Sequence, residues 1–305
     1  MQATHRAALR VACGVALAIA VAMPFLLAGE SRQPSPVITP GSTYVAAERG
    51  AGQHPRYVLP TRSFGEAKLA IDPAVFQPLG AKSYHILRLD EARPPGDALE
   101  HVERLLPRSR AGDPRATFDI YLSIFDCRIY IRGNPGMTYA AAAGGDVEAK
   151  ALSKTERKLM ECTSLAGNDS LWNEPWLSLA AEQGSVEAKL YYATDVDAVL
   201  GSASERLAHP EKILAWKERA KAYLEEAAGT GNLDAIAQLS NVYNSGILVE
   251  RSAEAAYAYA LAANRIDPNE YRDELLHLME KELSMKQRET ARAQSLHIYA
   301  SCCTP

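Results

Sequence analysis

The sequence predicts an all-α protein, a solenoid of about three to five stacked helix hairpins that ends in a capping helix. Two observations lead to this prediction. Apolar residues recur at spacings of three and four through much of the chain after residue 97, which is typical of amphipathic helices. A pattern of glycine, a polar residue, two variable positions and alanine also occurs four times. Such repetition indicates units that each bury an apolar face against the next.

The clearest unit lies within residues 216–263. Trp216, Ala220 and Tyr223 fall on one face of a first helix, which a pair of glycines ends. Asn232 is a favourable N-cap for a second helix on the far side of that turn. Small residues on both helices allow their backbones to approach closely. The stretch therefore predicts an antiparallel helix hairpin, followed by another alanine-rich helix.

At these residues the chain resembles the Sel-one-like repeat family, which is related to tetratricopeptide repeats. Tyr223 stands one residue early relative to the family pattern. The positions that match it are Ala227, Ala228, Gly231, Asn232, Ala235, Leu239, Tyr243 and Gly246. The resemblance implies that the stacked hairpins form a right-handed αα-superhelix.

Three earlier copies of the glycine–alanine pattern precede this unit. They are Gly112–Ala116, Gly145–Ala149 and Gly184–Ala188. The copy at Gly145 has Ser153 where an apolar residue is expected, so a degenerate repeat and a chance match in a linker both stay open. Residues 195–210 are interpreted as a loop inserted between hairpins. A more polar helix is expected to run from about Asp267 to Ile298 and to cap the array.

The N-terminal region predicts export from the cytoplasm. Residues 11–28 carry no charge and follow Arg6 and Arg10, so residues 1–28 are a signal peptide or an N-terminal membrane anchor. Either alternative places the rest of the chain outside the cytoplasm, free in the periplasm or tethered to the inner membrane by residues 11–28. Four segments follow from these patterns. They are the targeting segment 1–28, a flexible linker over 29–62, an irregular N-terminal cap over 63–96 and the repeat domain over 97–305.

The cysteines give a second indication of compartment. Cys127 lies at the end of one predicted helix, and Cys162 lies in a helix expected to fold back beside it. A disulfide between them is favoured in an oxidising compartment, whereas two buried reduced thiols are the alternative. Cys302 and Cys303 are expected to be free thiols or to link to another chain, with no defined role, because a bridge between adjacent cysteines is strained.

No catalytic pattern is present. The sequence lacks the nucleophile, zinc and phosphate-binding motifs of the common enzyme classes, and its histidines are too scattered to predict a metal site. We therefore expect no catalytic residues, no cofactor and no metal. The net charge is −4, or −6 without residues 1–28, which argues against nucleic-acid binding. The acidic pairs Asp195/Asp197 and Glu280/Glu282 are more typical of solvated helix faces than of sites.

The predicted function is binding. A solenoid presents a concave surface that suits protein segments, so we expect a non-catalytic scaffold of the bacterial cell envelope whose partner is an envelope protein or an extended peptide. The membrane is contacted only through the N-terminal segment. Two alternatives remain, an envelope hydrolase or cell-wall-binding protein acting on peptidoglycan-related ligands, and a structural tether or assembly factor. Candidate contact residues are Trp172, Tyr191, Tyr192, Tyr257 and Tyr259, for each of which core packing is the alternative.

Overall fold

The computed structural model describes residues 64–88, 92–133 and 140–304. The predicted targeting segment 1–28 and linker 29–62 lie outside these residues. Within the described ranges, no helix combines the length and the apolar character needed to cross a membrane.

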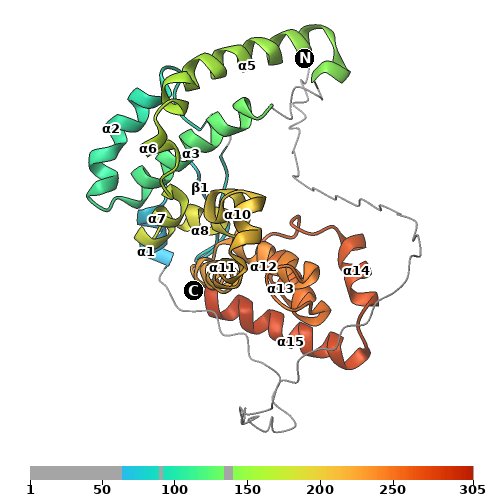
Figure 1. Cartoon of the computed structure of the whole chain (residues 1–305). Coiled ribbons are helices and arrows are strands. Elements are labelled where there is room, and N and C mark those ends of the chain that lie inside the picture. Colours follow the sequence, from blue (N-terminus) through green and yellow to red (C-terminus); the bar gives the residue numbers. More distant parts are fainter. Residues whose placement is uncertain (1–63, 89–91, 134–139, 305) are drawn as a thin grey trace, which may run out of the picture. The chain divides into compact units, whose positions relative to one another are not determined.

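The described chain is almost entirely helical, which confirms the predicted all-α class (Figure 1). The helices are α1 (Phe64–Ala70), α2 (Ala98–Arg110), α3 (Pro114–Ile131), α5 (Gly145–Ala166), α6 (Asp169–Trp172), α7 (Trp176–Gln183), α8 (Val186–Tyr192), α9 (Val196–Leu200), α10 (Ala203–Ala208), α11 (Pro210–Gly229), α12 (Leu233–Ser245), α13 (Ala253–Ile266), α14 (Asp273–Lys281) and α15 (Met285–Cys302). Two short antiparallel strands, β1 (Phe76–Pro78) and β2 (Tyr84–Ile86), form the one sheet of the described residues.

Three of the four glycine–alanine copies form the turn of a helix hairpin. The glycine adopts a positive φ, which is 89° at Gly112, 106° at Gly184 and 85° at Gly231. The next residue is the N-cap of the second helix, and its side chain accepts a hydrogen bond from the backbone N–H of the motif alanine. At the third turn, Asn232 Oδ1 lies 2.8 Å from the nitrogen of Ala235. The sequence pattern is therefore the chemistry of one capped turn.

The copy at Gly145 does not form a turn with a side-chain cap. It lies at the start of the long helix α5, whose N-cap is Gly144 and has no side-chain hydrogen bond. Ala149 is exposed, whereas Ala116, Ala188 and Ala235 are fully buried. The buried residues of α5 lie in its second half, where it packs against α2 and α3. The copy at Gly145 therefore does not form a capped turn of the kind seen at Gly112, Gly184 and Gly231.

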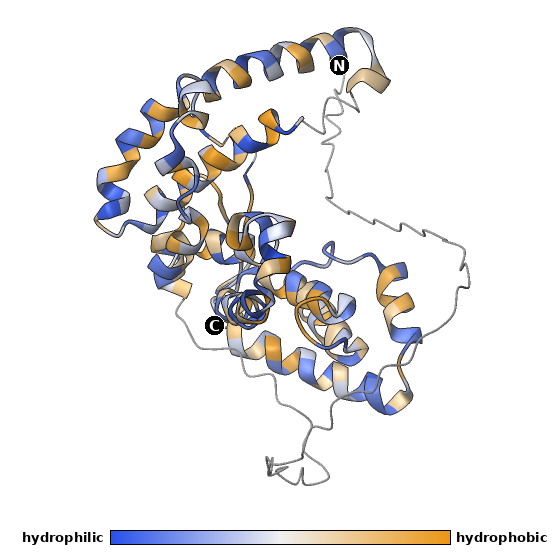
Figure 2. Cartoon of the chain, viewed as in Figure 1, coloured by the Kyte–Doolittle hydropathy of each residue, from blue (hydrophilic) through white to orange (hydrophobic). Residues whose placement is uncertain are grey.

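The hairpins stack in sequence order. Helix α3 of the first hairpin packs against α7, α8 of the second packs against α11, and α12 of the third packs against α13. Figure 2 shows hydrophobic residues (orange) and hydrophilic residues (blue) on different sides of many of these helices. The buried residues form two clusters, one around α2, α3 and α7 and the other around α11 to α15. Tyr192 and Tyr223 contact each other edge to face where the clusters meet.

The C-terminal region differs from the prediction in one respect. The single helix expected from Asp267 to Ile298 is two helices, α14 and α15. Helix α14 ends at Lys281, and a capping box formed by Ser284 and Gln287 starts α15 as a separate helix. The expected capping role belongs to α15, which packs along α13 and buries Ala291 and Ile298. The predicted loop 195–210 contains the short helices α9 and α10.

The exposure of the motif alanines predicts a difference between two matched substitutions. Ala235→Leu is expected to lower the free energy of unfolding by about 1–3 kcal/mol, because the larger side chain has no room between α11 and α12. Ala149→Leu is expected to change it by less than about 0.5 kcal/mol, because Ala149 is exposed. Urea unfolding followed by circular dichroism compares the two. Equal losses would contradict the assignment of Gly145–Ala149 to an exposed helix start.

Candidate functional site

Residues 71–88, which we call the strap, lie across the N-terminal ends of α12 and α8. The backbone N–H of Tyr84 donates to Gly231 O at 3.1 Å, and that of Ile86 donates to Asp234 Oδ2 at 3.0 Å. Arg88 Nε donates to Glu187 Oε1 at 2.7 Å. From the sequence we expected only an irregular cap in this region. The structure ties it to the second and third hairpins.

Tyr84 is the anchor of the strap. Its ring is fully buried, stacks on Phe76 at 4.8 Å and meets Phe64 edge to face. Its hydroxyl shares a 2.7 Å hydrogen bond with Thr230 Oγ1, and burial raises the pKa of Tyr84 above its ordinary value. A side chain at Gly231 would overlap the carbonyl oxygen of Lys82. The strap therefore needs a glycine at the third turn for space as well as for φ.

A cavity of about 670 Å³ lies between the strap, residues 92–95 and the first hairpin. Its volume is within the range of ligand-binding pockets. Helix α2 contributes His101 and α3 contributes Asp119, while the remaining lining comes from the strap and from residues 92–95. The lining residues are Asp72, Ala74, Val75, Gln77, Leu87, Arg88, Ala92, Arg93, Pro94, Pro95, His101 and Asp119.

The charged groups in and next to the cavity lining around Arg88 are unevenly paired. Arg88 is bound to Glu187, whose side chain is only 6% exposed, and its guanidinium lies over the ring of Phe118. Asp119 lies 3.8 Å from Arg88 and accepts no side-chain hydrogen bond from the described residues. Burial raises the pKa of Asp119 to about 6, which the charge of Arg88 opposes. Burial also raises the pKa of Glu187 and lowers that of His101.

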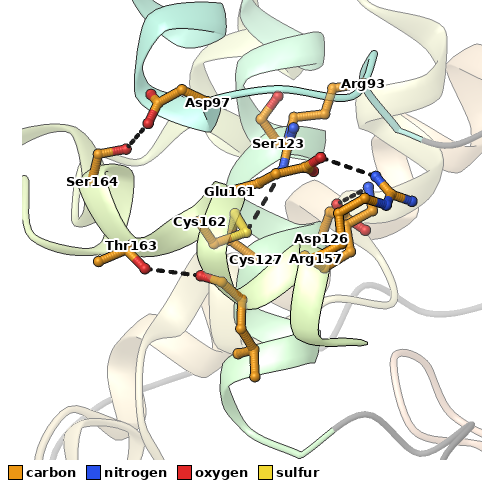
Figure 3. Close-up of a disulfide and its surroundings, with 12 residues drawn as sticks. Arg93, Asp97, Ser123, Asp126, Cys127, Arg157, Glu161, Cys162, Thr163 and Ser164 are labelled. Atoms are coloured by element: carbon orange, nitrogen blue, oxygen red, sulfur yellow. Dashed lines mark hydrogen bonds and ion pairs between the residues drawn. A yellow bond between two sulfur atoms is a disulfide. The ribbon is translucent and has the colours of Figure 1, made fainter. Parts of the chain in front are cut away.

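A disulfide lies near Arg93, one of the residues that line the cavity (Figure 3). The guanidinium of Arg93 is fully buried, donates to Gly96 O at 2.8 Å and pairs with Glu161 Oε2 at 2.9 Å. Its Nη2 also lies 3.9 Å from the sulfur of Cys162. Cys162 of α5 is bonded to Cys127 of α3, with their Cα atoms 5.5 Å apart. This confirms the disulfide predicted from the sequence.

The raised pKa of Asp119 predicts a pH-dependent effect of one substitution. A carboxyl whose pKa is higher in the folded than in the unfolded state destabilises the protein above its folded pKa, and this penalty vanishes below its unfolded pKa. Asp119→Asn is therefore expected to raise the thermal unfolding midpoint at pH 7.5 and to leave it unchanged near pH 3.5. Calorimetric scans at the two pH values test this. A lower midpoint at pH 7.5 would show that the carboxylate is stabilising.

Two of the five predicted contact residues belong to the core. Tyr257 and Tyr259 on α13 are 4% and 0% exposed, and Tyr259 stacks on Tyr243 at 5.7 Å. Neither is a solvent-facing position, which corrects the expectation for these two residues. The alternative of core packing describes them.

The other three candidates, Trp172, Tyr191 and Tyr192, are partly exposed, and each contacts different neighbouring side chains. Tyr191 belongs to an aromatic cluster with Phe118 and Tyr121, and Tyr192 meets Tyr223. Trp172 lies under the guanidinium of Arg128. A role for them in binding a partner stays a prediction.

The acidic pairs noted in the sequence lie in ion pairs and hydrogen bonds. Asp195 accepts a hydrogen bond from the hydroxyl of Tyr121, and Asp197 pairs with Arg132 and Arg206. Glu280 and Glu282 pair with Arg292 and Arg251. Among the described residues, no three His, Cys, Asp or Glu side chains gather in an arrangement that would hold a metal ion.

The two C-terminal cysteines differ from the expectation. Cys302 and Cys303 form a disulfide with each other and are 5% and 4% exposed. The prediction of free thiols or of a link to another chain was wrong for this structure. The helical end of α15 brings both residues against the neighbouring core, a placement that spacing in the sequence did not indicate.

Comparison with known proteins gives one structural likeness. No protein-family model matches the chain, and no curated protein matches it. A solved structure is similar to it, the crystal structure of c5321, a protective antigen present in uropathogenic Escherichia coli strains displaying an SLR fold. The identity is 18%, the match covers 68% of this chain and 57% of that chain, and the TM-score is 0.25. Because the two do not superpose as wholes, the assignment of helix hairpins rests on the capped turns and their packing.

Proposed function

We propose that this chain is a non-catalytic scaffold of the bacterial cell envelope that binds a protein or an extended peptide. The observation that supports this is the stack of three capped hairpins, because stacked hairpins commonly present an extended binding surface. The acidic pairs Asp195/Asp197 and Glu280/Glu282 are engaged in ion pairs and hydrogen bonds within the fold. Carboxylates that are held in internal pairs are more typical of a binding protein than of an enzyme active site.

Placement in the envelope is supported by the cysteines and by the N-terminal sequence. The disulfide between Cys127 and Cys162 joins two helices, and disulfides of this kind persist in oxidising compartments. Residues 11–28 form an uncharged stretch preceded by two arginines. We propose a periplasmic protein, released or tethered by this segment.

Capture from native envelopes tests the binding function. Leu214 on α11, the first helix of the third hairpin, is 66% exposed, and Met285 on α15 is 78% exposed. We expect cross-linking of the tagged full chain in cells to retain a reproducible partner that Leu214→Arg loses and that the matched control Met285→Arg keeps. A partner lost equally in both variants would argue against recognition by the first helices. The absence of any reproducible partner would favour the structural tether.

An envelope hydrolase is the second candidate, because one observation favours it. Asp119 lines the cavity, and burial raises its pKa to about 6, a value that suits a general acid. Hydrolysis of glycosidic bonds ordinarily needs a second carboxylate, for which Asp72 in the cavity lining is the candidate, since Glu187 is buried in its pair with Arg88. Incubation of the purified chain with peptidoglycan decides between the two functions. Release of soluble fragments that Asp119→Asn abolishes would overturn the non-catalytic proposal.

A further inference from the structure

We propose that the cavity beside the first hairpin binds a basic side chain, an ammonium or guanidinium group on an aliphatic stem. This assigns a ligand class to a specific site, and it depends on the proposed scaffold function only for the source of the side chain, which we take to be a protein partner.

The charges around the cavity favour a cation. Arg88 is paired with Glu187, and Arg93 is paired with Glu161, which also binds Arg157. The lowered pKa of His101 keeps that imidazole neutral at pH 7. Of the charged lining residues that the structure describes, the two carboxylates Asp72 and Asp119 remain without a full counter-charge.

The hydrogen bonding of these two carboxylates points the same way. Asp72 uses Oδ1 to accept from the backbone N–H of Ala74. Asp119 receives no hydrogen bond on its side chain from the described residues, and this side chain is 38% exposed. The part of this carboxylate that has left water finds no hydrogen-bond donor in its place, and the exposed part is accessible to a ligand. A ligand that brings N–H donors with positive charge restores both the hydrogen bonds and the charge balance.

The remaining lining favours an aliphatic stem over a bare ion. The apolar residues of the wall are Ala74, Val75, Leu87, Ala92, Pro94 and Pro95. These surfaces gain from burying methylene groups, as the stems of lysine and arginine offer. A divalent ion would require several converging ligands, and the described residues contain no group of three that would hold one. An anion would find both arginines already paired.

Titration of Asp119 gives the site a pH dependence. The groups that act on Asp119 are Arg88 and Asp72 of the strap, Glu187 of α8 and Arg108 of α2. Since the free carboxyl titrates near pH 6, binding a cation must displace a proton below that pH. We expect affinity for a cation to fall as the pH drops from 7.5 to 5.

Matched peptides test the proposal on the full chain. The probe is acetyl-Gly-Lys-Gly-amide, and its control replaces lysine by norleucine, which keeps the stem and removes the charge. Carbon-detected NMR of aspartate carboxyl groups follows binding at pH 7.5. We expect the lysine peptide to shift the Asp119 signal at least about tenfold more effectively than the norleucine peptide, because a charge-assisted hydrogen bond is lost with the ammonium. Cadaverine serves as the free amine, and binding of cadaverine alone would assign the site to small amines.

Two variants separate the site from general charge effects. Asp119→Asn is expected to weaken binding of the lysine peptide by about tenfold. Glu103→Gln removes one negative charge from an exposed position on α2 and is expected to leave affinity unchanged within about twofold. Circular dichroism verifies that both variants fold. Equal binding of the lysine and norleucine peptides, no binding of any probe, or unchanged affinity in Asp119→Asn would overturn the proposal. A captured envelope partner that Asp119→Asn retains would leave the scaffold function standing and reject this site alone.

Discussion

Replacing Cys127 and Cys162 together by alanine is expected to lower the free energy of unfolding by about 3–4 kcal/mol. The disulfide closes a loop with a sequence separation of 35, so its loss frees a long stretch of the unfolded chain. It also removes the covalent link between α3 and α5 beside the buried Arg93. Urea unfolding of the oxidised protein and of the variant measures the difference.

The second bridge supplies the control for this experiment. Cys302 and Cys303 are adjacent, so their bond restricts almost no additional chain, and changing both to alanine is expected to cost less than about 1.5 kcal/mol. Addition of dithiothreitol is expected to bring wild type down to the stability of the Cys127/Cys162 variant and to leave that variant nearly unaffected. Equal losses in the two double variants would mean that the 35-residue loop contributes nothing.

Gly231→Ala is expected to cost about 3 kcal/mol or more, whereas Gly184→Ala costs roughly 1–2 kcal/mol. Both glycines have positive φ values, so an alanine at either position is destabilised by the same kind of backbone strain. A methyl group at Gly184 meets no atom within 4 Å, but one at Gly231 overlaps the carbonyl oxygen of Lys82. The difference between the variants therefore reports the contact of the strap with the third turn.

The measurement for this pair is the unfolding free energy combined with proteolysis. Displacement of the strap in Gly231→Ala is expected to expose the peptide bonds around Lys82 to trypsin under native conditions, while Gly184→Ala stays resistant there. Identical free energies and identical cleavage in the two variants would show that the strap does not depend on this turn.

The hairpins could be predicted from the sequence because their chemistry is local. At Gly112, Gly184 and Gly231 the turn, the cap and the alanine that donates to the cap lie within five consecutive residues. The pattern at Gly145 shows the limit of this reasoning, since the same pattern there lies in the exposed start of α5. What differs there is the exposure of Ala149, which depends on tertiary packing and not on the local pattern.

The strap and the cavity could not be predicted because their partners are distant in sequence. Tyr84 reaches Thr230 across 146 positions, and Arg88 reaches Glu187 across 99. No spacing or motif joins Asp72, Arg88 and Asp119, which meet only when the strap folds back over the helices. The disulfide between Cys127 and Cys162 could be predicted, because a single reversal of the chain between two helices brings these cysteines together.

The long reach of the strap changes how the array should open. In a simple repeat array each unit contacts only its neighbours, so the ends fray independently and stability accumulates unit by unit. Here the β1–β2 hairpin is joined to the start of α12, so unravelling of the third hairpin must release residues that precede the first. Amide protons in α12 and in the strap then exchange with solvent through the same event. We therefore expect the strap and the hairpins to unfold as one cooperative unit. The contacts between distant parts of the sequence are also expected to slow folding relative to a repeat array with local contacts alone.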